Sequence, residues 1–307
     1  MLTRVGALIL LAGTLFLLYL ADTFTSGGAL AFAMLVFPFC LGFATQVLFD
    51  PQVVMRKRAV FGASFLATVV LSTILIATGV ESMGCALMAF PIFFVVQFLG
   101  IIMARAALDQ TPDDMSNAAR SSLLIVPFLP AFFAPSLPVW EGYHTVTNQI
   151  QIAASPDQVW AEIVNFPTVQ SSERLWTVSH NLIGTPVPLH SKISGEIRAA
   201  HWSQDISYNE RLTGQSATHM AWDIEFADGF KTHDSFQRIL PNSDQFELLS
   251  GRYDLAYDGR ITTLTLSTNY RLNTTFNTYV ALWGALFLGD NHNSILHVLK
   301  LRAEREA

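Results

Sequence analysis

Residues 149–166 read Gln-Ile-Gln-Ile-Ala-Ala-Ser-Pro-Asp-Gln-Val-Trp-Ala-Glu-Ile-Val-Asn-Phe, and this stretch decides the fold of the second half of the chain. Its first residues continue an alternation of apolar and polar side chains that begins at Tyr143, which indicates a half-buried strand. Ser155 can then cap a helix, Pro156 suits the first helical position, and Gln158 completes a capping box. The stretch therefore predicts a strand that passes directly into a short helix.

Further alternation follows this helix and predicts an antiparallel sheet. The expected strands cover residues 205–212, 220–226, 246–257 and 261–272. The last two are joined near Asp258-Gly259, which is a strong hairpin signal. An apolar stretch at 276–288 then leads past Gly289-Asp290 into a helical stripe at 294–306. This order of strand, short helices, antiparallel strands and long C-terminal helix predicts an α+β domain over residues 141–307.

The stretch at 149–166, together with Tyr270-Arg271-Leu272 and the helix at 295–304, resembles the START-like helix-grip superfamily and is similar to its bacterial members. That superfamily, also called SRPBCC, includes polyketide cyclase/dehydrases and lipid-transport domains. The resemblance covers about residues 143–306 and rests on hydrophobic positions and the Val159-Trp160 pair. It implies a curved antiparallel sheet wrapped around a long C-terminal helix, with an apolar cavity between them. The first 140 residues lie outside the resemblance.

The composition of residues 1–140 differs sharply from that of the rest. They contain six of the 18 basic and six of the 24 acidic residues, so the remaining residues carry 12 basic and 18 acidic ones and a net charge of −6. All eight histidines lie after residue 140. The first region contains five long apolar runs, and a helix of about 20 apolar residues can cross a bilayer. The predicted spans are residues 5–20, 29–49, 60–80, 83–104 and 121–140. We therefore expect a multi-pass helical membrane region over residues 1–140.

The fifth run decides the topology. Residues 121–140 contain four prolines, which kink helices, so the run either spans in a broken form or lies along the interface. Basic residues in short loops mark the cytoplasmic side, and the cluster Arg56-Lys57-Arg58 places the N-terminus there. With five spans the C-terminal domain lies outside the cytoplasm, and with four it lies inside. We expect five spans in the plasma (inner) membrane of a bacterial cell.

Several classes of site are disfavoured by the sequence. The acidic C-terminal domain is a poor partner for nucleic acid, which requires a basic surface. Cys40 and Cys85 both lie in apolar runs, so no disulfide framework or thiolate site is expected in the domain. Asp113-Asp114 lacks the further carboxylates of an Asp-rich metal motif, and no histidine pair has ligand spacing. No span carries a charged residue at its middle, which disfavours a transporter. We therefore expect no metal and no cofactor.

An apolar cavity is the expected functional feature, because pockets for small apolar ligands are lined by aromatic side chains and a few polar anchors. The alternation places Met220, Trp222, Ile224 and Phe226 on one covered face. The candidate lining residues are Trp160, Trp222, Phe226, Tyr253, Tyr270 and Trp283.

Three functions remain open at this point. The leading one is a membrane-anchored domain that binds a lipid or another apolar small molecule, with the bilayer as its second partner. The alternative is an enzyme of the cyclase or dehydratase type, and a third is a scaffold or interaction domain without ligand. No catalytic motif is present, and the acid–base candidates His201, Asp205 and His219 are expected on the solvent side of their strands. A polar side chain that points into the cavity beside a second titratable group would favour the enzyme.

Overall fold

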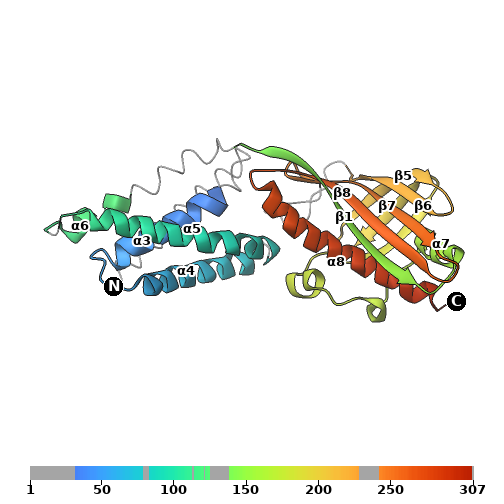
Figure 1. Cartoon of the computed structure of the whole chain (residues 1–307), viewed down its shortest axis with the longest axis horizontal. Coiled ribbons are helices and arrows are strands. Elements are labelled where there is room, and N and C mark those ends of the chain that lie inside the picture. Colours follow the sequence, from blue (N-terminus) through green and yellow to red (C-terminus); the bar gives the residue numbers. More distant parts are fainter. Residues whose placement is uncertain are drawn as a thin grey trace. The chain divides into compact units, whose positions relative to one another are not determined.

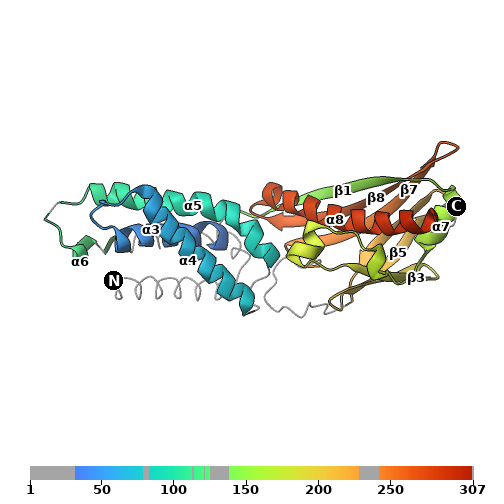
Figure 2. The ribbon, with the colours of Figure 1, turned by 90° about the horizontal axis from the view of Figure 1, so that it is seen from below.

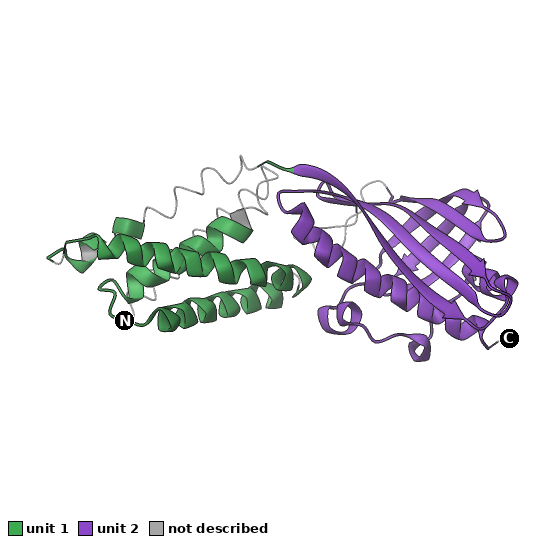
Figure 3. Cartoon of the chain, in the orientation of Figure 1, with its two compact units in different colours: residues 1–139 green, residues 140–307 purple. Residues whose placement is uncertain are grey.

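The computed structural model describes residues 32–78, 83–112, 114–120, 122–124, 138–227 and 242–305. The chain divides into two compact units, residues 1–139 (unit 1) and residues 140–307 (unit 2), which Figure 3 shows in green and purple.

Unit 1 is helical. Its described elements, labelled in Figure 1, are the π-helical turn η1 (Phe32–Val36) and the helices α3 (Phe37–Phe49), α4 (Lys57–Ala77), α5 (Met83–Asp109) and α6 (Asn117–Arg120). Among the described residues, α4 and α5 are the two helices whose length and apolar composition would allow them to cross a membrane.

The expected membrane runs meet three different outcomes. Runs 60–80 and 83–104 correspond to α4 and α5, although α4 starts earlier, at Lys57, and α5 continues past Arg105 to Asp109. The apolar helix described for run 29–49 covers Met34–Phe49, which is shorter than a span requires. Run 5–20 and most of run 121–140 lie outside the described residues.

Unit 1 packs through close backbone approach and a buried polar network. A Cβ atom on Gly42 would lie 2.1 Å from the carbonyl oxygen of Gln97, so α3 and α5 touch through their backbones. The Gln97 side-chain amide donates to the hydroxyl of Ser64 at 2.6 Å and to that of Thr68 at 2.8 Å. All three side chains are buried, so the polar groups of α4 and α5 face the inside of the unit.

Unit 2 is built on one antiparallel sheet with the order β1-β8-β7-β6-β5-β4-β3-β2. Its strands are β1 (Trp140–Ile152), β2 (Asn165–Phe166), β3 (Pro188–Ser194), β4 (Ile197–Trp202), β5 (Ser207–Gln215), β6 (His219–Glu225), β7 (Phe246–Tyr257) and β8 (Thr262–Thr274). Helix α7 (Pro156–Val164) and the turns η4 (Ser171–Glu173) and η5 (Ser179–Ile183) lie between β1 and β3 in the chain. The long helix α8 (Asn277–Ala303) runs across the sheet (Figure 2). The expected helix-grip arrangement is thus confirmed for unit 2.

Two local sequence signals in unit 2 form the structures they predict, the capping box before α7 and the Asp-Gly turn between β7 and β8. The Ser155 backbone amide donates to the Gln158 side-chain oxygen at 2.9 Å. The Gln158 backbone amide in turn donates to the Ser155 hydroxyl at 3.4 Å. Between β7 and β8, Asp258 accepts the backbone amides of Arg260 and Ile261, and Gly259 has a φ of 95°. The capping box therefore starts α7, and the aspartate and glycine form the hairpin.

One feature of unit 2 was not expected. Strands β3 and β4 were not predicted, because residues 188–202 mix small, charged and histidine side chains and show no clean apolar alternation. The helix expected after Phe276 is α8, which continues through Gly289 without interruption. A glycine inside a helix costs only about 1 kcal/mol relative to alanine, and packing on the sheet offsets that cost.

Polar contacts hold α8 in place at two points, one on the sheet and one on η4. The buried His292 contacts the Thr268 hydroxyl on β8 through Nε2 at 2.8 Å and the Asn148 side chain on β1 through Nδ1 at 3.1 Å. Near the C-terminal end, Arg302 donates to both carboxylate oxygens of Glu173 in η4, at 2.9 and 2.8 Å. The His292 contacts fix the position of α8 over β1 and β8, and the Arg302 contacts tie the end of α8 to η4.

Candidate functional site

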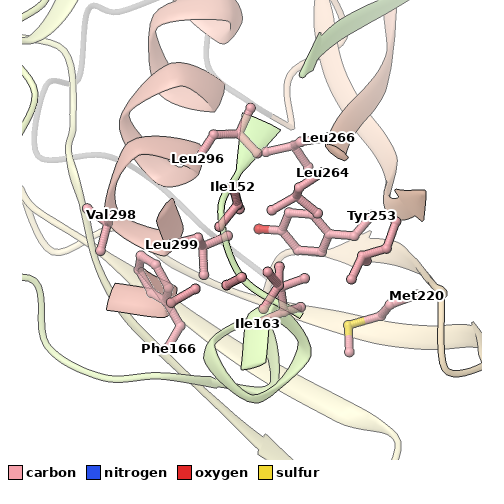
Figure 4. Close-up of a cluster of buried hydrophobic side chains, with 14 of the residues drawn as sticks. Ile152, Ile163, Phe166, Met220, Tyr253, Leu264, Leu266, Leu296, Val298 and Leu299 are labelled. Atoms are coloured by element: carbon pink, nitrogen blue, oxygen red, sulfur yellow. The ribbon is translucent and has the colours of Figure 1, made fainter. Parts of the chain in front are cut away.

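The interior of unit 2 lies between the sheet and α8. Its apolar cluster takes Leu296 and Leu299 from α8, Ile163 from α7, and side chains from several strands (Figure 4). In Figure 4 the Tyr253 hydroxyl points from its strand toward the helix. The members that come from β6 and β7 are Met220, Trp222, Tyr253 and Leu255.

A buried ion pair lies beside this cluster. Arg198 on β4 and Glu210 on β5 are direct cross-strand partners, and the Arg198 Nε donates to the Glu210 carboxylate. Both side chains are almost fully buried. Removal of two charges from water is expensive, so such a pair requires additional polar contacts to be tolerated.

Aromatic rings from β6 and β7 surround the Arg198 guanidinium. Its carbon lies 4.4 Å from the centre of the Trp222 ring and 5.5 Å from that of Tyr253. The two rings are 5.2 Å apart. These distances allow cation–π attraction, which is stronger when the groups are shielded from water. One Nη atom of Arg198 also lies 3.8 Å from the sulfur of Met220.

Glycine at position 251 makes room for this arrangement. Gly251 on β7 is the cross-strand partner of Trp222, and a Cβ atom there would lie 2.4 Å from an indole carbon. No side chain other than hydrogen fits at that distance. The indole therefore lies over the Gly251 backbone, next to Arg198.

Burial and neighbouring charges together shift the pKa values of the site. Burial lowers the pKa of Arg198, but Glu210 and the neighbouring tyrosines together outweigh burial, so the net shift of the pKa is upward and the guanidinium stays charged. Burial raises the pKa of Tyr253 to about 12, against the lowering influence of Arg198. Burial also raises the pKa of Tyr208, whose hydroxyl accepts the indole N–H of Trp202 at 3.0 Å. Both tyrosines are therefore neutral near pH 7.

One polar atom of the site has no partner. The indole nitrogen of Trp222 is buried and makes no hydrogen bond. A buried donor left unpaired costs about 1–3 kcal/mol. A ligand carrying a hydrogen-bond acceptor would remove that cost. The interior around Trp222 consequently combines apolar and aromatic side chains with a guanidinium, a carboxylate, a tyrosine hydroxyl and an unpaired N–H donor.

The predicted lining residues fall into separate groups. Trp222 and Tyr253 meet at Arg198, whereas Phe226 contacts the ring of Tyr208, whose centre is 5.2 Å away. Trp160 is partly buried against the apolar cluster. The remaining two residues, Tyr270 and Trp283, contact other rings.

Tyr270 and Trp283 belong to the region around the N-terminal half of α8. Tyr270 packs on Phe246 and His144, and its hydroxyl lies against Gly284 of α8. Trp283 contacts Tyr279 and Phe287 on its own helix.

The acid–base candidates from the sequence lie away from the ion pair. His201 and Asp205 are exposed. His219 is partly exposed and contacts Asp254 at 2.7 Å. The placement of His201 and His219 agrees with the alternation of their strands, whereas Asp205 lies in the turn between β4 and β5 and not on the expected strand. Among the residues that the structure describes, no three His, Cys, Asp or Glu side chains are grouped so that they could hold a metal ion.

Arg198 and Glu210 were missed by the sequence reasoning. Glu210 had a visible signal, because it occupies the same face of its strand as Ile206, Tyr208 and Leu212. A charged residue at an apolar-phase position indicates a buried partner. Arg198 had no comparable signal, because its strand was not recognised.

Comparisons with known proteins give fold neighbours only. No protein-family model and no curated protein matches the chain. Among solved structures, the Zhui aromatase/cyclase from Streptomyces sp. R1128 is 15% identical, with a TM-score of 0.34, and the match covers 54% of this chain and 96% of that one. A Thalictrum norcoclaurine synthase point mutant is 14% identical, with a TM-score of 0.31 and coverages of 55% and 99%. The protein XoxI from Bacillus cereus is 13% identical, with a TM-score of 0.32 and coverages of 53% and 98%. At this level of similarity the neighbours assign no activity to this chain.

Proposed function

We propose that unit 2 binds a lipid or another apolar small molecule between its sheet and α8, and that unit 1 anchors it in a membrane. The observation that carries the binding proposal is the unpartnered, buried N–H of Trp222 beside Arg198. Ligand sites are mostly apolar and contain a few well-placed polar groups that fix orientation. The preferred ligand is therefore an apolar molecule that carries one hydrogen-bond acceptor, such as a carbonyl or carboxylate oxygen.

Binding is favoured over acid–base catalysis by the charge state of the polar groups. The interior does contain titratable groups next to one another, which is the feature expected of an enzyme. General acids and bases work best with pKa values near the operating pH. The pKa of Tyr253 is instead raised to about 12, and the Glu210 carboxylate is neutralised by Arg198. The cluster is thus better suited to hold a polar group than to exchange protons with it.

The surface of unit 1 supports membrane anchoring. In the 18-residue apolar stretch of each helix, only 17% of α4 and 22% of α5 is buried. Large apolar side chains such as Leu66 on α4 and Val95 on α5 are more than half exposed, at 62% and 61%. The core helix of a soluble protein is mostly buried, whereas a membrane helix turns its apolar side chains to lipid and its polar ones inward. The inward network of Gln97, Ser64 and Thr68 fits the second description.

The basic residues support the proposed orientation. Arg105 at the end of α5 pairs with Asp50 at 3.3 Å and donates to the carbonyl of Met55, while Arg120 donates to the carbonyl of Pro51. These contacts gather Arg105, Arg120 and the cluster at 56–58 at one end of unit 1. The positive-inside rule makes this end cytoplasmic. If run 121–140 then crosses the membrane, unit 2 lies outside the cytoplasm.

Reporter fusions test the orientation. A reporter active only outside the cytoplasm, fused after Trp140, is expected to be active, and the same reporter fused after Asp109 is expected to be silent. Activity of a cytoplasm-only reporter after Trp140 would instead place unit 2 in the cytoplasm.

A photoreactive fatty acid tests the binding site. In full-length protein reconstituted in lipid nanodiscs, a benzophenone-bearing fatty acid should label peptides from β6, β7 and α8. Trp222→Phe removes the N–H donor and keeps an aromatic ring, so labelling should fall several-fold. Trp176→Phe is the matched control, because Trp176 is 67% exposed, and it should leave labelling unchanged. Labelling confined to α4 and α5, or equal in the two variants, would contradict the proposed site. Mass spectrometry of lipids extracted from the purified protein would then identify the natural ligand.

A further inference from the structure

One end of unit 2 exposes large apolar side chains. We define the apolar end of unit 2 as four exposed residues from the start of β1 and the first half of α8. They are Trp140, Tyr143, Leu282 and Leu286. Tyr143 is 68% exposed and Leu282 is 67% exposed. Tyr143 lies on the face of β1 away from α8, because His144 and Val146 take the inner face, so this end exposes apolar side chains on both sides of the sheet. Large exposed apolar side chains at one part of a surface usually mark an interaction site.

The two halves of the apolar end are tied together. Trp140 and Thr274 are partners in the β1–β8 ladder, and the Asn277 side chain at the start of α8 donates to the Trp140 carbonyl. Figures 1 and 2 show the beginnings of β1 and α8 at the same end of unit 2. Leu282 and Leu286 are four residues apart and so share one face of the helix.

The charge distribution distinguishes this end from the opposite one. Residues 276–289 contain no charged side chain. The opposite end is formed by the β7–β8 hairpin and the C-terminal turn of α8, and it carries Asp258, Arg260, Lys300 and Glu304. The first half of α8 is therefore uncharged and the opposite end of unit 2 is charged, while the start of β1 carries Glu141, which is paired with Arg271.

The chain itself indicates what covers the apolar end. Thirteen residues, 125–137, connect Leu124 of unit 1 to Pro138, and none of them is charged. A chain of this length reaches about 50 Å at most. Trp140 therefore comes soon after an uncharged segment of chain. That segment leads from unit 1, which we propose lies in the bilayer. Tryptophan and tyrosine are enriched at the level of the lipid headgroups, where their amphipathic rings are stabilised.

We infer that the apolar end of unit 2 docks on the bilayer surface, with Trp140, Tyr143, Leu282 and Leu286 inserted among the lipid headgroups. This inference rests on the membrane anchoring proposed above and adds a second contact. No unpaired basic residue belongs to the apolar end, since Arg271 beside it is paired with Glu141 and Glu247. Docking should therefore be driven by apolar burial and depend little on anionic lipid. It would also hold the interior of unit 2 next to its supply of apolar ligand.

Lipid quenching of a fluorophore tests the docking in the full-length protein. Cys40 and Cys85 are replaced by alanine, and single cysteines at Leu282 or Tyr257 carry a nitrobenzoxadiazole group. Tyr257 is the matched control, because it is 49% exposed at the charged end. In phosphatidylcholine nanodiscs containing a lipid with a nitroxide near its headgroup, emission at position 282 should be quenched several-fold more than at 257. Addition of phosphatidylglycerol should not change the ratio.

Three results would overturn the inference. Equal quenching at both positions would show that the bilayer does not select the apolar end. Blue-shifted emission at 282 without quenching would show that protein, either a second copy or unit 1, covers it instead. Strong dependence on anionic lipid would contradict the apolar mode. A label at Leu286 repeats the test if the variant at 282 does not fold. Photolabelling by the fatty acid in the same samples separates the two proposals, because lost docking with retained labelling refutes only the docking.

Discussion

Arg198 and Trp222 lie face to face in the interior of unit 2, with the guanidinium carbon 4.4 Å from the centre of the indole ring. Glu210 neutralises the cation, and Gly251 leaves the space that the indole occupies. Four neighbouring strands thus contribute one residue each to a buried polar group within an apolar core.

Removal of one partner of the Arg198–Glu210 ion pair should lower the stability of unit 2 strongly, whereas replacement of both partners by apolar residues should lower it little. Glu210→Gln leaves Arg198 buried without a counter-charge, which should lower the free energy of unfolding by about 3–5 kcal/mol. Arg198→Met combined with Glu210→Leu should recover most of that loss, because apolar side chains of similar volume need no partner. Denaturant unfolding of the detergent-solubilised chain, followed by tryptophan fluorescence, measures both. A double variant as unstable as the single one would show that the pair does more than balance charge.

Gly251→Ala should displace the indole of Trp222. The new Cβ would lie 2.4 Å from an indole carbon, so the ring must move away from Arg198. Overpacking of this kind costs about 1–3 kcal/mol. The control is Gly289→Ala in α8, where the nearest atoms are 3.9 Å away and a gain of up to about 1 kcal/mol in helix propensity is expected. Thermal unfolding of the two variants should therefore shift in opposite directions, and equal shifts would contradict this packing.

His292 should make unit 2 sensitive to acid. Burial lowers its pKa from 6.5 to about 4, so the folded state keeps the ring neutral where the unfolded state binds a proton. The unfolded state then binds more protons between pH 6.5 and 4, and stability falls as the pH falls through that window, by about 3 kcal/mol in total. His292→Gln should be less stable at pH 7 but should lose this slope. Unfolding curves at several pH values check this, and an unchanged slope in the variant would assign it to another group.

Residues 138–307 should fold without unit 1. The β-sheet, α7 and α8 form their own apolar core, and the net charge of −6 calculated for residues 141–307 favours solubility. Circular dichroism and a cooperative unfolding transition of the expressed fragment are the measurements. The exposed Leu282 and Leu286 are the expected cause of any self-association, so Leu282→Ser with Leu286→Ser should improve its solubility. Aggregation of both forms under all mild conditions would contradict independent folding.

The fold of unit 2 could be predicted largely because its signals are local. Ser155 and Gln158 act within one turn, Asp258 and Gly259 act within one hairpin, and alternation identifies strands without knowledge of their partners. Strands β3 and β4 could not be predicted, because residues 188–202 show no clean apolar alternation.

Only the aromatic half of the candidate site could be predicted, because the ion pair depends on contacts between strands. Trp222 and Tyr253 could be named because aromatic side chains on the apolar face of a strand are expected inside. Arg198 and Glu210 become tolerable there only through each other, across two strands, and a single sequence does not show that pairing. In unit 1, apolar run length predicted α4 and α5, but their inward polar network depends on which helix faces touch.

The pairing of β1 with β8 also has a consequence for biosynthesis. Thr147 and Ser267, which bond across this ladder, are separated by 120 residues. At a synthesis rate of ~5–20 residues per second, β1 is complete roughly 6–24 s before its partner exists. Throughout that interval it is an alternating strand with free backbone donors and acceptors. Non-local pairing of this kind also slows folding. The nascent chain is therefore most vulnerable to aggregation between the synthesis of its first and last strands, and chaperones that bind extended segments would act in that interval.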